Sequence, residues 1–157
     1  MKNIEALLLQ RGVTKRDIID CVYFLQSQYF ENLDINIIEH YVDSVLNKRE
    51  VQQAIATGIA IDMAAEQRSF GSEELQNIIL NDEGLFGVDE VLAYGICNLY
   101  GSIALTNFGY IDKIKPGIIG ILNDDHEHQC NTFLDDIVGA VAAAAASKLA
   151  HDRENIK

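Results

Sequence analysis

Acidic residues gather beside apolar segments at four places in the second half of the chain. They are Asp82 with Glu83, Asp89 with Glu90, Asp112, and Asp135 with Asp136. Carboxylate oxygens are the ligands that Mg²⁺ prefers, and a bound Mg²⁺ can offset the charge of a phosphate ester and orient an attacking water. Lys115 follows Asp112 closely and can act as a point charge that binds the phosphate. These residue types together indicate a Mg²⁺-dependent site that hydrolyses a phosphate ester.

Each acidic group also has a purely structural interpretation. Acids in the first turn of a helix interact favourably with the helix dipole, and Asp135 can close a capping box with Thr132. Asp82 and Glu83 precede Gly84, which is typical of a solvated turn. Consecutive acids on a helix project about 100° apart, so at most one of each pair points directly at a common centre. The other member then lies in an outer position or binds a second ion.

The segments that must position these residues follow the helical period. Apolar spacing predicts helices over residues 3–11, 14–25, 34–46, 51–67, 73–80, 88–105 and 117–122 and from 132 onwards, with a turn region over 107–116. No alternating strand pattern of useful length occurs. The alanine run at 142–146 favours a helix that neighbouring helices approach closely. We therefore expect an all-α, single-domain helical bundle over residues 1–157, with the alanine-rich C-terminal helix at its centre.

Charge and composition exclude several classes of function. The net charge is −12, so the chain gains nothing from counterion release on nucleic acid, and an anionic membrane surface repels it. The three cysteines are far apart, which is typical of reduced thiols in a reducing compartment. The N-terminus is too interrupted by charge for a signal peptide, and neither apolar stretch, 91–105 or 137–146, reaches the roughly 20 residues that span a bilayer. We expect a soluble cytoplasmic protein, at most peripheral to the inner face of the membrane.

Two further candidates for chemistry lie in the polar segment before Asp135. His126 and His128 are two residues apart, a spacing that enforces no metal geometry, and zinc normally takes three or four such ligands. Cys130 has no evident adjacent base, which disfavours a thiol nucleophile. The carboxylates therefore remain the strongest candidates.

Three segments carry a resemblance to a known family. GVDEVLAYGI, YIDKIKPGII and FLDDIVGAVAAA occur in the order and at the approximate spacing of the motifs of phosphatidylglycerophosphatase A. The resemblance runs from about Val51 to about Ala150, which leaves residues 1–50 as an N-terminal helical extension of a 51–150 core. Within the family, the chain is most similar to the soluble Firmicute branch of low-temperature-requirement C proteins.

The resemblance implies Mg²⁺-dependent dephosphorylation of phosphatidylglycerophosphate to phosphatidylglycerol. It assigns the metal to Asp89, Glu90, Asp112, Asp135 and Asp136, and catalysis to Asp112, Lys115, Asp135 and Asp136. Lys115 would hold the phosphate, and Pro116 would fix the turn that aims it. Typical members also carry membrane-spanning helices and a His-Gly-Gly-like stretch before the Asp-Asp motif, whereas residues 126–131 here contain no glycine.

Two other functions are compatible with the same residues. One is a soluble phosphatase that acts on a small metabolite. The other is a non-catalytic helical interaction or regulatory protein that retains the family's scaffold. Faces rich in alanine and glycine, together with an amphipathic N-terminal region, also lead us to expect a homo-oligomer. Turnover of a lipid ester, of a soluble ester or of neither distinguishes the three functions.

Overall fold

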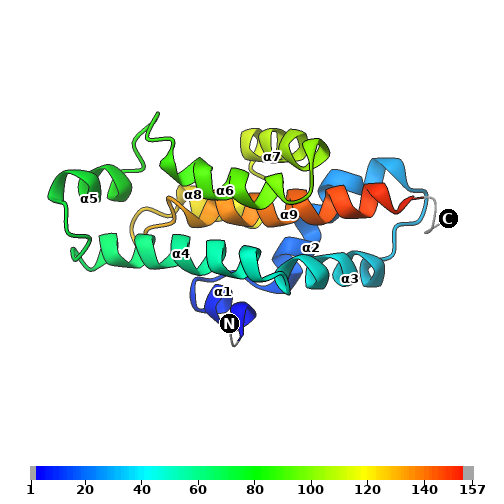
Figure 1. The fold of residues 1–157 in the computed structure, drawn as a ribbon, viewed down its shortest axis with the longest axis horizontal. Helices are drawn as coiled ribbons and strands as arrows, with labels where there is room; N and C mark the ends of the chain where they lie inside the picture. Colours follow the sequence, from blue (N-terminus) through cyan, green and yellow to red (C-terminus); the bar gives the residue numbers. More distant parts are fainter. Residues whose placement is uncertain (1–2, 154–157) are drawn as a thin grey trace.

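The computed structural model describes residues 3–153, and the regular structure in this part of the chain is entirely helical (Figure 1). The prediction of an all-α fold is confirmed. The helices are α1 (Ile4–Gln10), α2 (Lys15–Gln26), the 3₁₀ turn η1 (Ser27–Tyr29), α3 (Ile35–Leu46), α4 (Arg49–Glu66), α5 (Glu73–Leu80), α6 (Val88–Asn98), α7 (Ser102–Ile114), α8 (Ile118–Asp124) and α9 (Leu134–His151).

Helix α9 is the centre of the fold, as the alanine run predicted. It packs against α2, α3, α4, α6, α7 and α8, and Figure 1 shows it running through the middle of the assembly. Ala142 to Ala146 are all fully buried. Gly58 of α4 also permits close packing on α9, because a Cβ at this position would overlap Ile137 Cδ1 and lie 3.3 Å from Phe133 Cβ. Small side chains therefore let the surrounding helices approach the α9 backbone.

The first three helices share the core with the rest of the molecule. Ile18, Val22, Ile38 and Val42 are buried in one hydrophobic cluster with the residues of α9. Thr14 and Asp17 form the predicted capping box at the start of α2, and Asp34 accepts a hydrogen bond from the Asn36 N–H at the start of α3. The segment before residue 50 thus packs on the same central helix as the segment that carries the acidic motifs.

Two predicted boundaries in the middle of the chain were wrong. A single helix was expected over 88–105, but α6 ends at Asn98, and Gly101, with φ of 94°, turns the chain back into α7. A turn was expected over 107–116, but α7 is helical to Ile114. Phe108 and Ile111 explain the second difference, because both are buried and this packing outweighs the weak helix propensity of Asn107 and Gly109. Within residues 3–153, no helix is both long and apolar enough to cross a membrane.

Candidate active site

The two aspartates at the start of α9 are held in place by a residue that is distant in the sequence. The N-cap residue Phe133 makes no side-chain capping bond. Instead, the carboxylate of Asp62 in α4 accepts hydrogen bonds from the N–H groups of Phe133 and Leu134, each at 3.0 Å. Asp62 therefore caps α9 in trans and fixes the position of the first turn.

The capping box between Thr132 and Asp135, the structural alternative for Asp135, does not form. The Thr132 hydroxyl donates to the Ile79 carbonyl at 2.5 Å, so it contacts the end of α5 rather than its own helix. The Asp135 carboxylate accepts from the Asp136 N–H at 2.7 Å. Asp135 is thus left facing the site, because Asp62 performs the capping.

Asp62 is fully buried, with no exposed area. Burial raises its pKa to about 7, while the N–H groups of Phe133 and Leu134 and the charge of Arg11 act in the opposite direction. Sequence analysis did not select this residue. A signal was present, because Asp62 continues the spacing of the buried residues Ile55 and Ile59 along α4 and is therefore an acid on a core-facing stripe.

Three of the acidic motifs converge on Asp136. Its side chain is hydrogen-bonded to Asp89 at the start of α6 and to Asp112 near the end of α7. Burial and the adjacent charges of Asp135 and Asp89 raise the pKa of Asp136 far above that of an ordinary carboxyl group. Burial also raises the pKa of Asp135, and Lys115 opposes this shift. Motifs from α6, α7 and α9 therefore form one site, as their order in the sequence suggested.

Lys115 supplies the positive charge of this site. Its Nζ lies 3.0 Å from Asp112 Oδ1 and 3.7 Å from Asp135 Oδ2. Burial lowers the pKa of Lys115, but Asp112, Asp135 and Asp136 outweigh it, so the net shift is upward and the lysine stays charged. The residue ends α7 in the left-handed conformation with φ of 52°, and a Cβ on Gly120 would lie only 2.7 Å from the Lys115 carbonyl oxygen. Glycine at 120 thus permits the turn that aims the lysine.

Asp82 also belongs to this site, although its sequence context is typical of a solvated turn. The residue is half-buried, and burial followed by the charge of Asp89 raises its pKa, while His126 and Lys115 act in the opposite direction. We call Asp82, Asp89, Asp112, Asp135 and Asp136 the acidic cluster. Lys115 is the basic residue in contact with it.

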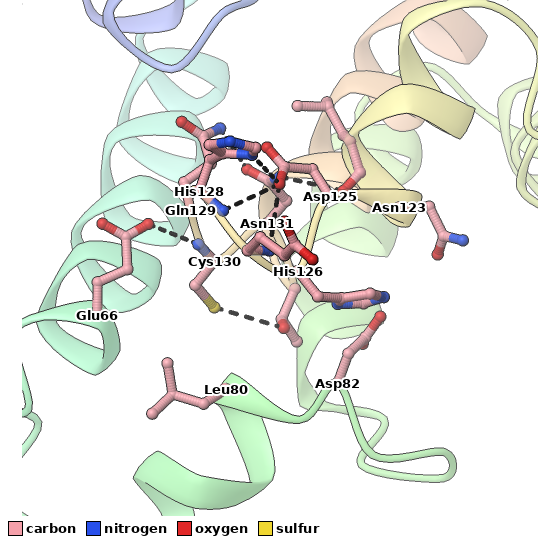
Figure 2. A pocket seen from close by; sticks show the side chains of 13 residues that line it. Glu66, Leu80, Asp82, Asn123, Asp125, His126, His128, Gln129, Cys130 and Asn131 are labelled. Carbon is pink, nitrogen blue, oxygen red and sulfur yellow. Dashed lines mark hydrogen bonds and ion pairs between the residues drawn. The ribbon is translucent and has the colours of Figure 1, made fainter.

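A polar cavity of about 250 Å³ lies beside the acidic cluster (Figure 2). Asp82 belongs to the acidic cluster and also lines the cavity, and the His126 ring points toward Asp82 in Figure 2. One wall is held by Glu66, which accepts from the Cys130 N–H at 2.6 Å and forms an ion pair with Arg11. The remaining lining residues are Leu80, Leu122, Asn123, Asp125, Glu127, His128, Gln129, Asn131 and Thr132.

Comparison with known proteins identifies the family. Residues 12–151 match the family model of phosphatidylglycerophosphatase A. The chain belongs to this family. The matched range begins well before Val51, where the recognisable motifs begin, and includes α2 and α3.

Relatives within the family cover nearly the whole chain. The chain is 56% identical over 146 residues to the uncharacterized protein YutG of Bacillus subtilis strain 168, an alignment that covers 93% of this chain and 87% of YutG. The crystal structure of the low temperature requirement C protein of Listeria monocytogenes is similar with a TM-score of 0.91 and 53% identity, over 96% of this chain and 94% of that one. The structure of YpjQ from B. subtilis gives a TM-score of 0.92 and 46% identity, over 98% and 94% of the two chains.

One residue that the family resemblance assigned to the metal has a hydrogen-bond partner on its own helix. Glu90 lies one position after Asp89, and its Oε2 accepts a hydrogen bond from the Tyr94 hydroxyl of its own helix at 3.4 Å. The 100° step between consecutive helical residues explains why Asp89 meets Asp136 and Glu90 does not follow it. Glu90 as a metal ligand stays a prediction.

The histidines and the cysteine of this family member lie at the cavity rather than among the carboxylates. His128 Nδ1 lies 3.0 Å from Asp125 Oδ1, and its side chain is largely exposed. Burial raises the pKa of the Cys130 thiol to about 11, with a further upward contribution from Asp62. The thiol therefore stays protonated at neutral pH, in agreement with the expectation that it is not a nucleophile.

The chemistry of the acidic cluster fits a hard divalent cation. Its donors are carboxylate oxygens, and Lys115 provides the positive charge paired with them. Among residues 3–153, no three His, Cys, Asp or Glu side chains stand close enough together to enclose an ion as they lie. The fit therefore rests on donor type and on the excess of negative charge. Mg²⁺ suits such a site, because it takes few protein ligands and keeps several waters.

Proposed function

We propose that the protein is a Mg²⁺-dependent phosphomonoester hydrolase that converts phosphatidylglycerophosphate to phosphatidylglycerol. One observation carries this proposal: Asp136 contacts both Asp89 and Asp112, so three separate motifs of the family come together, and Lys115 pairs with Asp112. A structural role for each acid alone would not require them to meet, because carboxylates in contact repel one another unless a proton or a cation lies between them.

Asp89, Asp112, Asp135 and Asp136 are the residues that would hold Mg²⁺. The bound ion would supply charge neutralisation at the phosphate. Lys115 binds a phosphoryl oxygen through its ammonium group, for which it needs only to exchange one of its two carboxylate partners. A carboxylate of the Asp135–Asp136 pair orients a water or takes its proton, and the water oxygen attacks phosphorus. The ester P–O bond breaks, and the alcohol leaves with a proton.

The cavity favours a second candidate substrate, a small soluble phosphomonoester. Its volume of about 250 Å³ is small, and most of its lining residues are polar or charged. Such a space suits a hydroxylated leaving group better than an acyl chain, because apolar groups gain little beside side chains that must stay hydrated. The catalytic chemistry is the same for both substrates, so the choice between them is a question for an assay.

The deciding experiment measures release of inorganic phosphate from phosphatidylglycerophosphate in detergent micelles and from glycerol 3-phosphate, each with Mg²⁺ or with EDTA. Mg²⁺-dependent turnover of the lipid is the expected result. Turnover of the soluble ester alone would mean that the substrate is a soluble phosphomonoester and not the lipid. Lys115→Ala should abolish release. Lys113→Ala is the matched control, because Lys113 is exposed on the same last turn of α7. Well-folded protein that releases no phosphate from either ester would overturn the proposal in favour of a non-catalytic scaffold.

A further inference from the structure

The outer surface of the α6–α7 hairpin differs from the rest of the molecule in charge. The chain contains 24 acidic and 12 basic residues, yet none falls between Val91 and Ile111. Both helices pack on α9, so the side chains that they expose form the outside of the hairpin. The exposed large hydrophobic residues on the two helices are Val88, Val91, Tyr94, Leu99, Ile103, Leu105 and Ile114, together with Tyr110, whose ring stacks on Phe24 of α2.

Helix α6 is apolar on opposite sides. Ala93, Ile96 and Cys97 are buried on the side that packs on α9 and α4. The opposite side carries Val88, Val91, Gly95 and Leu99 at the spacing of one helical stripe, and all four are exposed. A helix that is apolar on both sides is typically packed against other protein segments on both sides. The described part of the chain covers only one of them.

Two glycines on this surface point to a close helical neighbour. Gly95 lies in the middle of α6 and Gly109 in the middle of α7, and among the described residues nothing lies within 4 Å of the position of a Cβ on either one. A glycine inside an exposed helix destabilises the helix relative to alanine. The packing of this chain therefore gives no reason for either glycine, whereas a backbone that approaches from outside would.

We infer that the outer surface of the α6–α7 hairpin is the interface between two copies of this chain. Two copies with a net charge of −12 each repel one another, and this charge-free surface is where they approach with the least repulsion. The patch consists of the same residue types on both copies, as a two-fold interface requires. Without Tyr110, seven half-exposed side chains expose on the order of 500 Å², a large part of the roughly 800 Å² per partner of a stable interface.

A second copy fits this surface better than a lipid surface. Helices that lie on membranes carry Lys or Arg on their polar sides and commonly Trp at the boundary. Here Asp89, Glu90 and Asp112 border the patch with Lys113 and Lys115 as the nearby cations, and the chain contains no Trp. The alanine run cannot form the interface between two copies, because Ala142 to Ala146 are fully buried inside one copy.

The test is the mass of the full-length protein in solution, measured by sedimentation velocity over a range of concentrations. Wild type should sediment as a dimer or a larger even-numbered assembly. Val91→Glu should weaken association at least 100-fold, with an unchanged helical circular dichroism spectrum. Leu9→Glu is the matched control and should stay associated, because Leu9 on α1 is 60% exposed and Val91 is 62% exposed.

Gly95→Leu is an independent variant, since the open space at this position allows the single chain to fold while a neighbouring helix would be displaced. It should weaken association as Val91→Glu does. The inference is overturned if wild type is monomeric throughout, or if both variants associate as wild type does. It is also overturned if monomeric wild type floats with phosphatidylglycerol vesicles and Val91→Glu does not, since the occupant would then be a lipid surface.

Discussion

Buried carboxylates lie on two sides of the start of α9, and their surroundings differ. On the α4 side, Asp62 accepts hydrogen bonds from two backbone N–H groups at the positive end of the helix dipole. On the α6–α7 side, Asp136 faces Asp89, Asp112 and Asp135. Both carboxyl groups have raised pKa values, and burial is the largest cause in each case.

The difference separates a structural carboxylate from one suited to binding. The Asp62 carboxylate needs no bound ion or ligand, because backbone N–H groups donate to its oxygens and the protein cation Arg11 lies nearby. The carboxylates around Asp136 cannot all be charged without a cation among them. A buried acid is therefore informative about function through the groups that face it, and its burial alone does not distinguish the two roles.

Replacing Asp136 should have the largest effect on activity. Asp136→Asn should reduce phosphate release roughly 10²- to 10⁴-fold, the range for loss of a positioned acid or base, while the melting temperature stays close to that of wild type because the Asn amide can donate to Asp89 and Asp112 as a protonated carboxyl does. Asp62→Asn keeps one acceptor oxygen and should stay within about tenfold of wild type. Near-equal turnover of the two variants would remove the distinction between the two carboxylates.

Replacing Asp62 should have the largest effect on stability. Asp62→Ala leaves the N–H groups of Phe133 and Leu134 buried without an acceptor, at a cost of about 1–3 kcal/mol each, so a loss of about 3 kcal/mol is expected in urea unfolding. Asp136→Ala should cost less, because its partners Asp89 and Asp112 are partly exposed and solvent can replace the lost hydrogen bonds. The reverse ranking of the two alanine variants would contradict this assignment.

The pH dependence of the unfolding free energy should reveal the protonation of Asp62. Its folded pKa of about 7 lies above the ordinary value of 3.8, so the folded state binds the proton more tightly. Its stabilising contribution is therefore complete below about pH 4 and is lost as pH rises through about 7, at up to about 1.4 kcal/mol per pH unit. The difference in unfolding free energy between wild type and Asp62→Asn isolates this contribution, since other acids titrate in both. A difference that does not change between pH 5 and 7 would show that Asp62 is charged throughout.

The smallest effect is expected at Glu90. Glu90→Gln should change Mg²⁺-dependent turnover less than about threefold, because the side chain is directed at Tyr94. Asp89→Asn, at the adjacent position, should lower it at least 100-fold as a member of the acidic cluster. Equal losses would instead make Glu90 a ligand of the metal and would extend the acidic cluster along α6.

Features that depend on a short stretch of sequence were predicted well. The alanine run predicted a central α9, because helix propensity and side-chain size are properties of the segment itself. The capping box of Thr14 and Asp17 was confirmed for the same reason. The three acidic motifs also indicated one common site, and they meet at Asp136.

Features that depend on distant partners could not be predicted in this way. Asp62 caps a helix that begins about 70 residues later in the chain, and no local pattern indicates that partner. The helical extent of α7 also depended on packing, since burial of Phe108 and Ile111 overrides the local turn signals.

The sequence by itself determined that the chain is helical, which helix is central and which acids are candidates, because helical period, propensity and motif order are local properties. Only the tertiary structure decided that Asp89 contacts Asp136 while Glu90 pairs with Tyr94, because the rotation of a helix about its axis is set by packing. It also decided that Asp62 holds α9 and that the α6–α7 surface stays uncovered within one copy. These outcomes depend on contacts between segments far apart in the chain.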